Sequence, residues 1–221
     1  MKEIAYEVSL VSGFEGRGSR SDLGLRPMRA PTLKRRSTVI LMVLALLLSG
    51  SALAGPPYTT VEMTVDIPDV TLIDQDANEV ELRELVDSGE VVMVDFIFGT
   101  CTTICPILSA GFSNLQRRLG SGPGGPVLIS FSIDPEHDGP EVMTKYLKRY
   151  RAQPGWSFLT GDRDDIDVIM HAFDAYVPDK MSHQPVTFIK GNGSDQWVKI
   201  DGLVSTADLL AELEKIRGGR S

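Results

Sequence analysis

One apolar run constrains the fold of this chain more than any other feature of its sequence. Residues 91 to 98 read VVMVDFIF, an almost unbroken series of β-branched and aromatic side chains. This pattern is typical of a strand buried on both faces, and such strands lie in the middle of sheets that are covered by helices. The run ends at Gly99 and a helical pattern follows it, so the sequence predicts an α/β fold.

The helical pattern covers residues 105 to 119. Its apolar side chains recur at spacings that stack on one face of a helix: Ile107, Leu108, Phe112, Leu115 and Leu119. Two arginines stand in the last turn and Gly120 follows them, which is a common way for a helix to end. We therefore predict a helix that opens at the cysteines and ends at Gly120.

Further elements are predicted on both sides of this unit. Residues 127 to 133 and 156 to 161 each read as a strand with a helix after it, and residues 184 to 202 read as a hairpin. A last helix is predicted over residues 205 to 218, with a serine as its N-cap and a glycine at its end. Residues 70 to 85 suggest either a hairpin or a strand followed by a short helix.

The predicted order, β-α-β-α-β-α-β-β-α, describes one layered α/β domain. Its sheet is expected to be parallel in the centre and antiparallel at one end. A pair of cysteines at a strand-to-helix junction in this order indicates a thioredoxin-like fold, a three-layer sandwich around a mixed central sheet.

The N-terminal residues 1 to 54 read as a leader that is separate from the folded domain. A basic cluster at residues 34 to 36 precedes an apolar run from Val39 to Leu48, and small residues then offer a cleavage site before Gly55. The alternative is an uncleaved anchor over residues 38 to 54, but its apolar core is short of the roughly 20 residues that span a bilayer. We expect a signal peptide, and export to the periplasm or another extracytoplasmic space.

This interpretation also sets the domain boundaries. Met28 begins a signal of ordinary length, so residues 1 to 27 are interpreted as an over-extended start. Residues 55 to 60 are predicted as a linker and residues 61 to 217 as the folded domain. The membrane is expected as a partner only if the leader is retained.

The charge of the chain after the leader excludes some partners. Of 22 Lys and Arg and 30 Asp and Glu, 8 and 4 precede residue 55, which leaves 14 and 26 and a net charge of −12. A domain with this charge should repel nucleic acid and anionic lipid, so no nucleic-acid partner is expected.

Both cysteines of the chain lie in the segment GTCTTICP, residues 99 to 106. A disulfide between Cys101 and Cys105 closes too small a loop to stabilise the fold much, which argues against a structural staple. Cys101 is expected at the strand-helix boundary and Cys105 one helical turn further on, so a separation of four places both sulfurs on one face near the positive N-terminus of the helix, where thiolates are favoured. Thiolates serve both disulfide exchange and soft-metal binding, so these two interpretations stay open.

Two thiolates alone give linear coordination, so a metal site needs a further donor. Of the three histidines, His183 is the best placed, because it precedes a predicted strand that runs beside the cysteine helix. Pro185 occupies the position where thioredoxin-like folds carry a cis-proline. The alternative is that His183 is merely exposed or caps a turn; His171 and His137 are expected on the surface and in an acidic loop.

That acidic loop, residues 132 to 141, follows a strand end, at the edge where open α/β sheets place their sites. It is either a solvated turn in which Asp138 caps the next helix, or a set of acids near the thiolates. On the second interpretation Asp134 and Asp138 interact with the metal or with an incoming partner, and Asp134 is the acid expected to face the site.

Four motifs in this order resemble the Sco/SenC family of copper-binding, thioredoxin-like proteins that help to assemble cytochrome c oxidase. They are CTTICP, SIDPEHDGPEVMTKYLKRY, GWSFLTGD and a histidine before a strand, and the resemblance covers roughly residues 61 to 210. It implies that Cys101, Cys105 and His183 bind Cu(I) or Cu(II), and that Asp134 is the acid of the family's Asp-Pro motif. One departure is the segment around the histidine, with Ser182 in place of an aspartate and Pro185 added. The second is the leader, which reads as cleavable although many members keep a membrane anchor.

The resemblance implies a metallochaperone that delivers copper to the binuclear copper site of oxidase subunit II, or that reduces the cysteines of that site. The rival function is a general periplasmic thiol-disulfide oxidoreductase, with Cys101 and Cys105 as its redox couple and a thioredoxin-like reductant as partner. If Pro185 is cis, electron transfer competes with copper transfer. A thiol peroxidase is disfavoured, since no Gln/Trp pairing of the glutathione peroxidase kind is recognisable near Cys101.

Overall fold

The structure is a computed structural model that describes residues 57–88, 91–122, 124–191 and 193–218. The predicted leader, its cleavage site and the start at Met28 lie outside the described residues. Within the described part of the chain, no helix combines the length and the apolar character needed to cross a bilayer.

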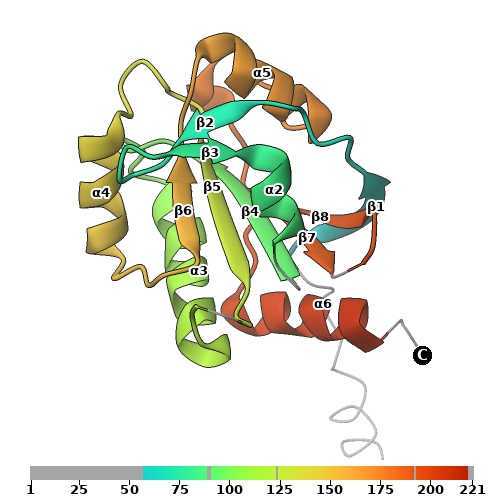
Figure 1. Cartoon of the computed structure of the whole chain (residues 1–221). Coiled ribbons are helices and arrows are strands. Elements are labelled where there is room, and N and C mark those ends of the chain that lie inside the picture. Colours follow the sequence, from blue (N-terminus) through green and yellow to red (C-terminus); the bar gives the residue numbers. More distant parts are fainter. Residues whose placement is uncertain (1–56, 89–90, 123, 192, 219–221) are drawn as a thin grey trace, which may run out of the picture. The chain divides into compact units, whose positions relative to one another are not determined.

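Six strands form a mixed sheet in the order β1-β8-β7-β4-β5-β6 (Figure 1). The parallel strands are β4 (Val91–Ile97), β5 (Val127–Ser132) and β6 (Trp156–Leu159). The hairpin strands β7 (Val186–Gly191) and β8 (Gln196–Asp201) pair antiparallel, and β7 also pairs antiparallel with β4. Every residue of β4 is buried, which confirms that the apolar run forms a central strand.

The N-terminal part of the domain combines more elements than the sequence indicated. Strands β2 (Thr71–Ile73) and β3 (Glu79–Glu81) form a hairpin, and the short helix α2 (Leu82–Asp87) follows directly, so both alternatives for this stretch occur together. Strand β1 (Thr59–Thr64), which pairs with β8, was not predicted. Most of its residues are exposed, so it lacks the apolar pattern that reveals the buried strands.

Helices α3 (Cys105–Leu119) and α4 (Pro140–Arg149) cover one face of the sheet. Phe112 of α3 packs edge-on against Trp156, and Tyr146 of α4 does so against Phe158, with ring centroids 5.7 and 5.3 Å apart. The C-terminal helix α6 (Thr206–Gly218) lies beside α3 (Figure 1). The Ser205 hydroxyl accepts a hydrogen bond from the Asp208 N–H and so caps α6 as predicted.

The opposite face is covered by α5 (Arg163–Ala172), and Phe173 directly after this helix stands in the middle of an aromatic cluster. The ring of Phe173 contacts those of Phe96, Phe131, Phe188 and Trp197. Complete burial of a side chain of this size is worth about 1.5 to 3 kcal/mol. Helices on both faces of a mixed sheet give the predicted three-layer α/β fold, and the packed core fixes the end of β4 from which the cysteine loop departs.

Candidate dithiol and metal site

Both cysteines lie where β4 ends and α3 begins, and both are free thiols buried in the protein. The helix begins at Cys105, as its apolar pattern predicted, but Cys101 lies in the loop before it and not at the first turn, so the expectation that both sulfurs share one helix face was wrong. Pro106 explains the difference, because a proline fits the first turn of a helix but lacks the N–H that a position deeper in the helix needs. Cys101 instead sits in the preceding loop, where its N–H donates to the Phe98 carbonyl at 3.1 Å.

The two thiols have unlike environments. Burial favours a raised pKa for Cys101, but hydrogen bonds from the Cys105 thiol, from the N–H groups of Thr103 and Cys105 and from the Thr103 hydroxyl outweigh it, so the pKa lies below its ordinary value. Burial raises the pKa of Cys105 well above its ordinary value, and its hydrogen bond to Cys101 adds to the effect. Cys101 is therefore the thiol that ionises first, and Cys105 is the one that keeps its proton.

An acid that the sequence analysis passed over lies within the same region. Asp95, in the middle of β4, is fully buried, and neither of its carboxyl oxygens has a well-formed hydrogen bond in the described part of the chain. Burial raises the pKa of Asp95 to about 7, although the nearby Ser130 hydroxyl opposes the rise. When it ionises, its charge contributes to the raised pKa of Cys105. The only sequence signal for it is a single acid inside an apolar run.

Asp138 fastens the cysteine loop to the neighbouring strand. Its Oδ2 atom accepts hydrogen bonds from the Gly99 N–H at 2.9 Å and from the Ser132 hydroxyl at 2.7 Å. It does not cap α4, whose N-cap is Gly139 without a side-chain hydrogen bond, so the expectation of a capping role was wrong. The carboxyl group reaches the loop because Gly99 has no side chain: a Cβ there would lie 2.7 Å from Asp138 Oδ1 and 2.8 Å from Val142 Cγ1.

His183 lies buried directly after the short helix η1 (Lys180–Ser182), just before β7. Its Nε2 atom lies 2.7 Å from the carbonyl oxygen of Phe96 in β4. Because a carbonyl only accepts, Nε2 carries the proton and Nδ1 keeps a lone pair in the neutral ring. Burial lowers the pKa of His183 and so favours this neutral form, which is the form that binds metals.

The donor set of Cys101, Cys105 and His183 fits copper in its chemistry, since thiolates suit Cu(I) and imidazole suits Cu(II). The segment with Cys101 is hydrogen-bonded to Phe98, directly after β4, and the segment with His183 is hydrogen-bonded to Phe96 in β4. Their three ligand atoms do not all lie within 4.8 Å of one another in this structure. Joint coordination by all three residues therefore requires their ligand atoms to come closer together.

Pro185 does not have the predicted geometry. No peptide bond in the described ranges is cis, so the expectation of a cis-proline beside the cysteines was wrong. The carbonyl of Pro185 accepts a hydrogen bond from the Gly202 N–H at 2.9 Å, which extends the pairing of the β7-β8 hairpin by one step. A trans proline at the beginning of a strand suits this position, because its missing N–H is not needed in the ladder.

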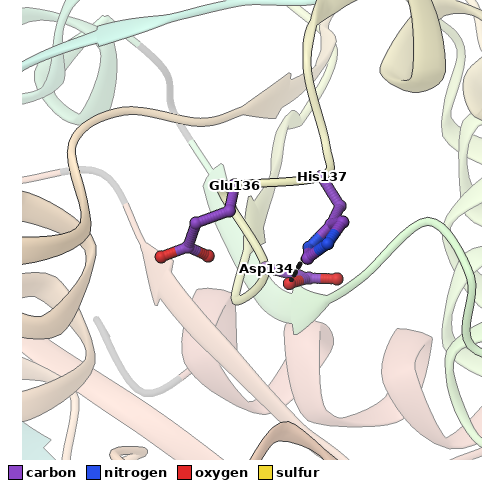
Figure 2. A group of neighbouring side chains, drawn as sticks. All are labelled: Asp134, Glu136 and His137. Atoms are coloured by element: carbon purple, nitrogen blue, oxygen red, sulfur yellow. Dashed lines mark hydrogen bonds and ion pairs between the residues drawn. The ribbon is translucent and has the colours of Figure 1, made fainter.

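Asp134 is buried and belongs to a group of three side chains on the loop after β5 (Figure 2). One ligand atom each from Asp134, Glu136 and His137 lie within 4.8 Å of one another. Both acids already have cationic partners, Lys180 for Asp134 and Arg163 for Glu136, and Asp134 also lies within hydrogen-bonding distance of the His137 Nδ1 atom. Burial would raise the pKa of Asp134, but its hydrogen bonds to Lys180 and His137 hold it below the ordinary value.

The two predicted acids therefore contact different parts of the candidate site. Asp138 contacts the cysteine loop directly, whereas Asp134 contacts the segment that leads to His183 through Lys180. The remaining histidine, His171, is exposed on α5 and stacks on Tyr176 with ring centroids 4.1 Å apart.

A thioredoxin-like α/β fold with two free thiols where a central strand meets a helix defines the class of this protein. The family model SCO1/SenC matches residues 62–217, and the chain belongs to this family.

Individual relatives agree with this assignment. The chain is 30% identical over 162 residues to the SCO1 protein homolog of Bacillus subtilis, which covers 69% of this chain and 83% of the relative. It resembles the solved structure of BsSco, a Sco-family cytochrome c oxidase assembly protein with a disulfide switch, at 29% identity and a TM-score of 0.58, covering 71% of this chain and 95% of the other. Arabidopsis thaliana ScoI with copper bound shares the fold at 23% identity and a TM-score of 0.52, covering 67% and 96%.

Proposed function

We propose that this protein binds a copper ion through Cys101, Cys105 and His183 and delivers it to the binuclear copper site of cytochrome c oxidase subunit II. Membership of the SCO1/SenC family supports this proposal, as do relatives described as oxidase assembly proteins and as copper-bound. In this function copper is cargo that is taken up and released, and the protein has no turnover of its own.

The observation that carries the proposal is the protonation state that the fold favours in the potential copper ligands. The Phe96 carbonyl fixes the His183 tautomer that keeps Nδ1 free of a proton, and burial keeps the ring neutral. The hydrogen bonds around Cys101 favour its thiolate. Two thiolates hold the soft Cu(I) ion without further help, whereas Cu(II) depends more on the imidazole. His183 should therefore matter most for the oxidised metal.

Copper titration of the reduced protein tests this function. Wild-type protein should bind about one equivalent of copper, and His183→Ala should weaken Cu(II) binding and change its absorption spectrum. The matched control is His171→Ala, which removes an exposed imidazole on α5 and should leave both unchanged. If the reduced protein holds no copper, or if His183→Ala binds Cu(II) with the same affinity and spectrum, the proposal fails.

The unlike thiols favour a second function, the reduction of a disulfide in the recipient protein. The Cys101 thiolate attacks one sulfur of that disulfide, which forms a mixed disulfide and releases the other sulfur as a thiol after it takes up a proton. Cys105 then loses its proton and attacks the Cys101 sulfur, which forms the Cys101–Cys105 disulfide and releases the second thiol. The recipient gains two electrons, and a thioredoxin-like reductant restores the pair.

Trapping of the mixed disulfide tests this second function. Reaction of Cys105→Ser with a peptide that carries the disulfide of the oxidase copper site should accumulate a covalent adduct at Cys101. Cys101→Ser should form much less adduct, because the remaining thiol is buried and has a raised pKa. Equal trapping by the two variants would contradict the assigned order of attack.

The location of this activity is part of the proposal. A basic cluster, an apolar run and small residues before Gly55 support export to the periplasm or another extracytoplasmic space. N-terminal sequencing of the protein isolated from cells should yield Gly55 as the first residue. A mature protein that begins at residue 1 or at Met28 would contradict cleavage.

A further inference from the structure

The segment that carries His183 is attached to the rest of the domain by a contact that the copper-ligand set does not include. Lys180 in η1 forms an ion pair with Asp134 on the loop after β5, across a separation of 46 residues in the sequence. We propose that Lys180 is a positioning residue for His183: through Asp134 it holds η1 at the edge of the sheet and so presents the imidazole for Cu(II). This inference rests on the proposed function of the site.

Asp134 is a firmly fixed acceptor for the Lys180 ammonium group. Its side chain is only 5% exposed, its Oδ1 atom lies 2.9 Å from His137 Nδ1, and its backbone N–H donates to the Ser132 hydroxyl at 3.1 Å. Lys180 is 33% exposed, and its ammonium nitrogen lies 5.5 Å from the centre of the Phe98 ring, within the range of a cation–π contact. The lysine thus joins η1 both to the loop after β5 and to the last apolar side chain before the cysteine loop.

A short chain of hydrogen bonds transmits the position of Lys180 to His183. The Asp179 carboxylate accepts from the Met181 N–H at 2.9 Å, and the Asp179 carbonyl accepts from the Ser182 N–H at 2.8 Å. The His183 N–H then lies 3.3 Å from the Lys180 carbonyl. Because these bonds close one tight turn, η1 and the backbone of His183 move as a unit.

Packing alone does little to hold this turn in place. None of the three residues of η1 is buried, and the Met181 side chain is 73% exposed. Lys180 and Asp134 line a cleft of about 430 Å³ together with residues of α5 and of the segment 176–179. The open cleft leaves room for η1 to shift, and the ion pair, the contact of Lys180 with the Phe98 ring and the hydrogen bond from His183 to Phe96 restrain it.

A comparison of Cu(I) and Cu(II) binding distinguishes a positioning role of Lys180 from a general effect on the stability of the protein. Loss of the ion pair leaves both thiolates intact, so Cu(I) binding should persist. Cu(II) depends more on the imidazole and should respond to a displaced His183. Removal of a group that orients a metal ligand typically lowers affinity by about 10- to 100-fold, which sets the size of the expected effect.

The test compares Lys180→Met with Glu136→Gln. Lys180→Met keeps an unbranched apolar chain but removes the charge, and it should lower Cu(II) affinity by about 10- to 100-fold with unchanged Cu(I) affinity. Glu136→Gln breaks an ion pair on the same loop that does not involve η1, and it should change neither. Lys180→Arg retains the charge and should bind Cu(II) more tightly than Lys180→Met does.

A second measurement needs no metal. Amide hydrogen exchange in the metal-free protein should be faster at residues 181 to 183 in Lys180→Met and in Asp134→Asn, but not in Glu136→Gln. The variant with both substitutions should exchange no faster than either single variant, because the two residues act through one contact.

The outcomes distinguish this inference from the proposed function. If Lys180→Met matches the wild type in Cu(II) affinity and in exchange at residues 181 to 183, the positioning role is overturned, whatever His183→Ala does. If His183→Ala binds Cu(II) normally, the proposed copper site fails, and faster exchange in Lys180→Met would still support the attachment of η1 through Lys180. A fall in Cu(I) affinity of Lys180→Met equal to the fall in Cu(II) affinity would also overturn the inference, because it would indicate general damage to the fold.

Discussion

The cysteine side and the histidine side of the site are both held by acids from one loop, but in different ways. Asp138 is buried and binds the Gly99 N–H, and burial raises its pKa. Asp134, four residues earlier, binds Lys180 of η1 and has a lowered pKa because hydrogen bonds from Lys180 and His137 outweigh its burial. The cysteine loop is thus fastened through its backbone, whereas the histidine segment is fastened through a side-chain ion pair that borders solvent.

This difference gives the two sides opposite responses to pH. Asp95 and Asp138 have raised pKa values, so the folded protein binds their protons more tightly than the unfolded chain does. The free energy of unfolding therefore falls as pH rises from the unfolded to the folded pKa of each acid. Asp134 and His183 have lowered pKa values, so their contributions are present above the unfolded pKa and are lost as pH falls. A fall in pH should therefore destabilise the histidine side first, whereas a rise in pH should destabilise the cysteine side first.

The largest expected effect comes from removal of the Asp138 carboxyl group. Asp138→Ala leaves the Gly99 N–H and the Ser132 hydroxyl without their acceptor in a buried position and should lower the free energy of unfolding by about 3 kcal/mol. Urea unfolding at neutral pH measures it. Asp138→Asn keeps an acceptor oxygen and serves as the control, with a smaller loss expected. Equal stability of Asp138→Ala and the wild type would remove Asp138 as the anchor of the cysteine loop.

A smaller effect, of opposite sign, is expected for Asp95→Asn. The wild type holds a buried carboxylate without well-formed hydrogen bonds once pH exceeds the raised pKa of about 7. The shift corresponds to at most about 4 kcal/mol, and relaxation around the charge should reduce this, so we expect Asp95→Asn to be about 2 kcal/mol more stable than the wild type at pH 8.

The advantage of Asp95→Asn should disappear below the unfolded pKa of the acid, because the carboxyl group is then neutral in both states. Urea unfolding of both proteins at several pH values between about 3 and 8 gives the two curves. Parallel curves would show that Asp95 does not cause the loss of stability at high pH.

The smallest expected effect distinguishes the ion pair of Asp134 from that of Glu136, both of which lie on the loop after β5. Asp134→Asn should lower the free energy of unfolding at pH 7 by about 1 to 2 kcal/mol, because Lys180 loses its buried anionic partner, and the difference from the wild type should shrink as pH falls below the unfolded pKa of the acid. Glu136→Gln breaks a pair that is largely exposed and should change stability by less than about 0.5 kcal/mol. Thermal unfolding at pH 7 and pH 3 distinguishes the two, and a loss for Asp134→Asn that is as large at pH 3 as at pH 7 would argue against the charge as its source.

The buried elements of the fold could be predicted because their signals are local. The run over residues 91 to 98 and the inward-facing residues of α5 follow directly from apolar periodicity, and the hairpin of β7 and β8 follows from two strands around a short turn. The edge strand β1 escaped prediction because its side chains are mostly exposed and its partner β8 lies more than a hundred residues away. Local pattern carries no information about such a pairing.

The site was predictable in its residues but not in its contacts. Cys101, Cys105 and His183 could be named from motif and order, yet the beginning of the helix at Cys105 depended on one proline. The roles of Asp138 and Lys180 required tertiary structure, because each contacts a residue some 40 positions away. The trans geometry of Pro185 reflects its place at the beginning of the hairpin, which a general rule about the fold did not capture.

The close approach of Gly99 to Asp138 has a consequence for protein engineering. The cysteine motif cannot be transplanted as a single peptide, because its loop is held by the Asp138 carboxyl group from the loop after β5, which Ser132 of β5 supports in turn, and a side chain at Gly99 would crowd Asp138 and Val142. The smallest portable unit is therefore two adjacent parallel strands together with the loops that follow them. A scaffold that supplies only the motif would display two cysteines on an unsupported loop.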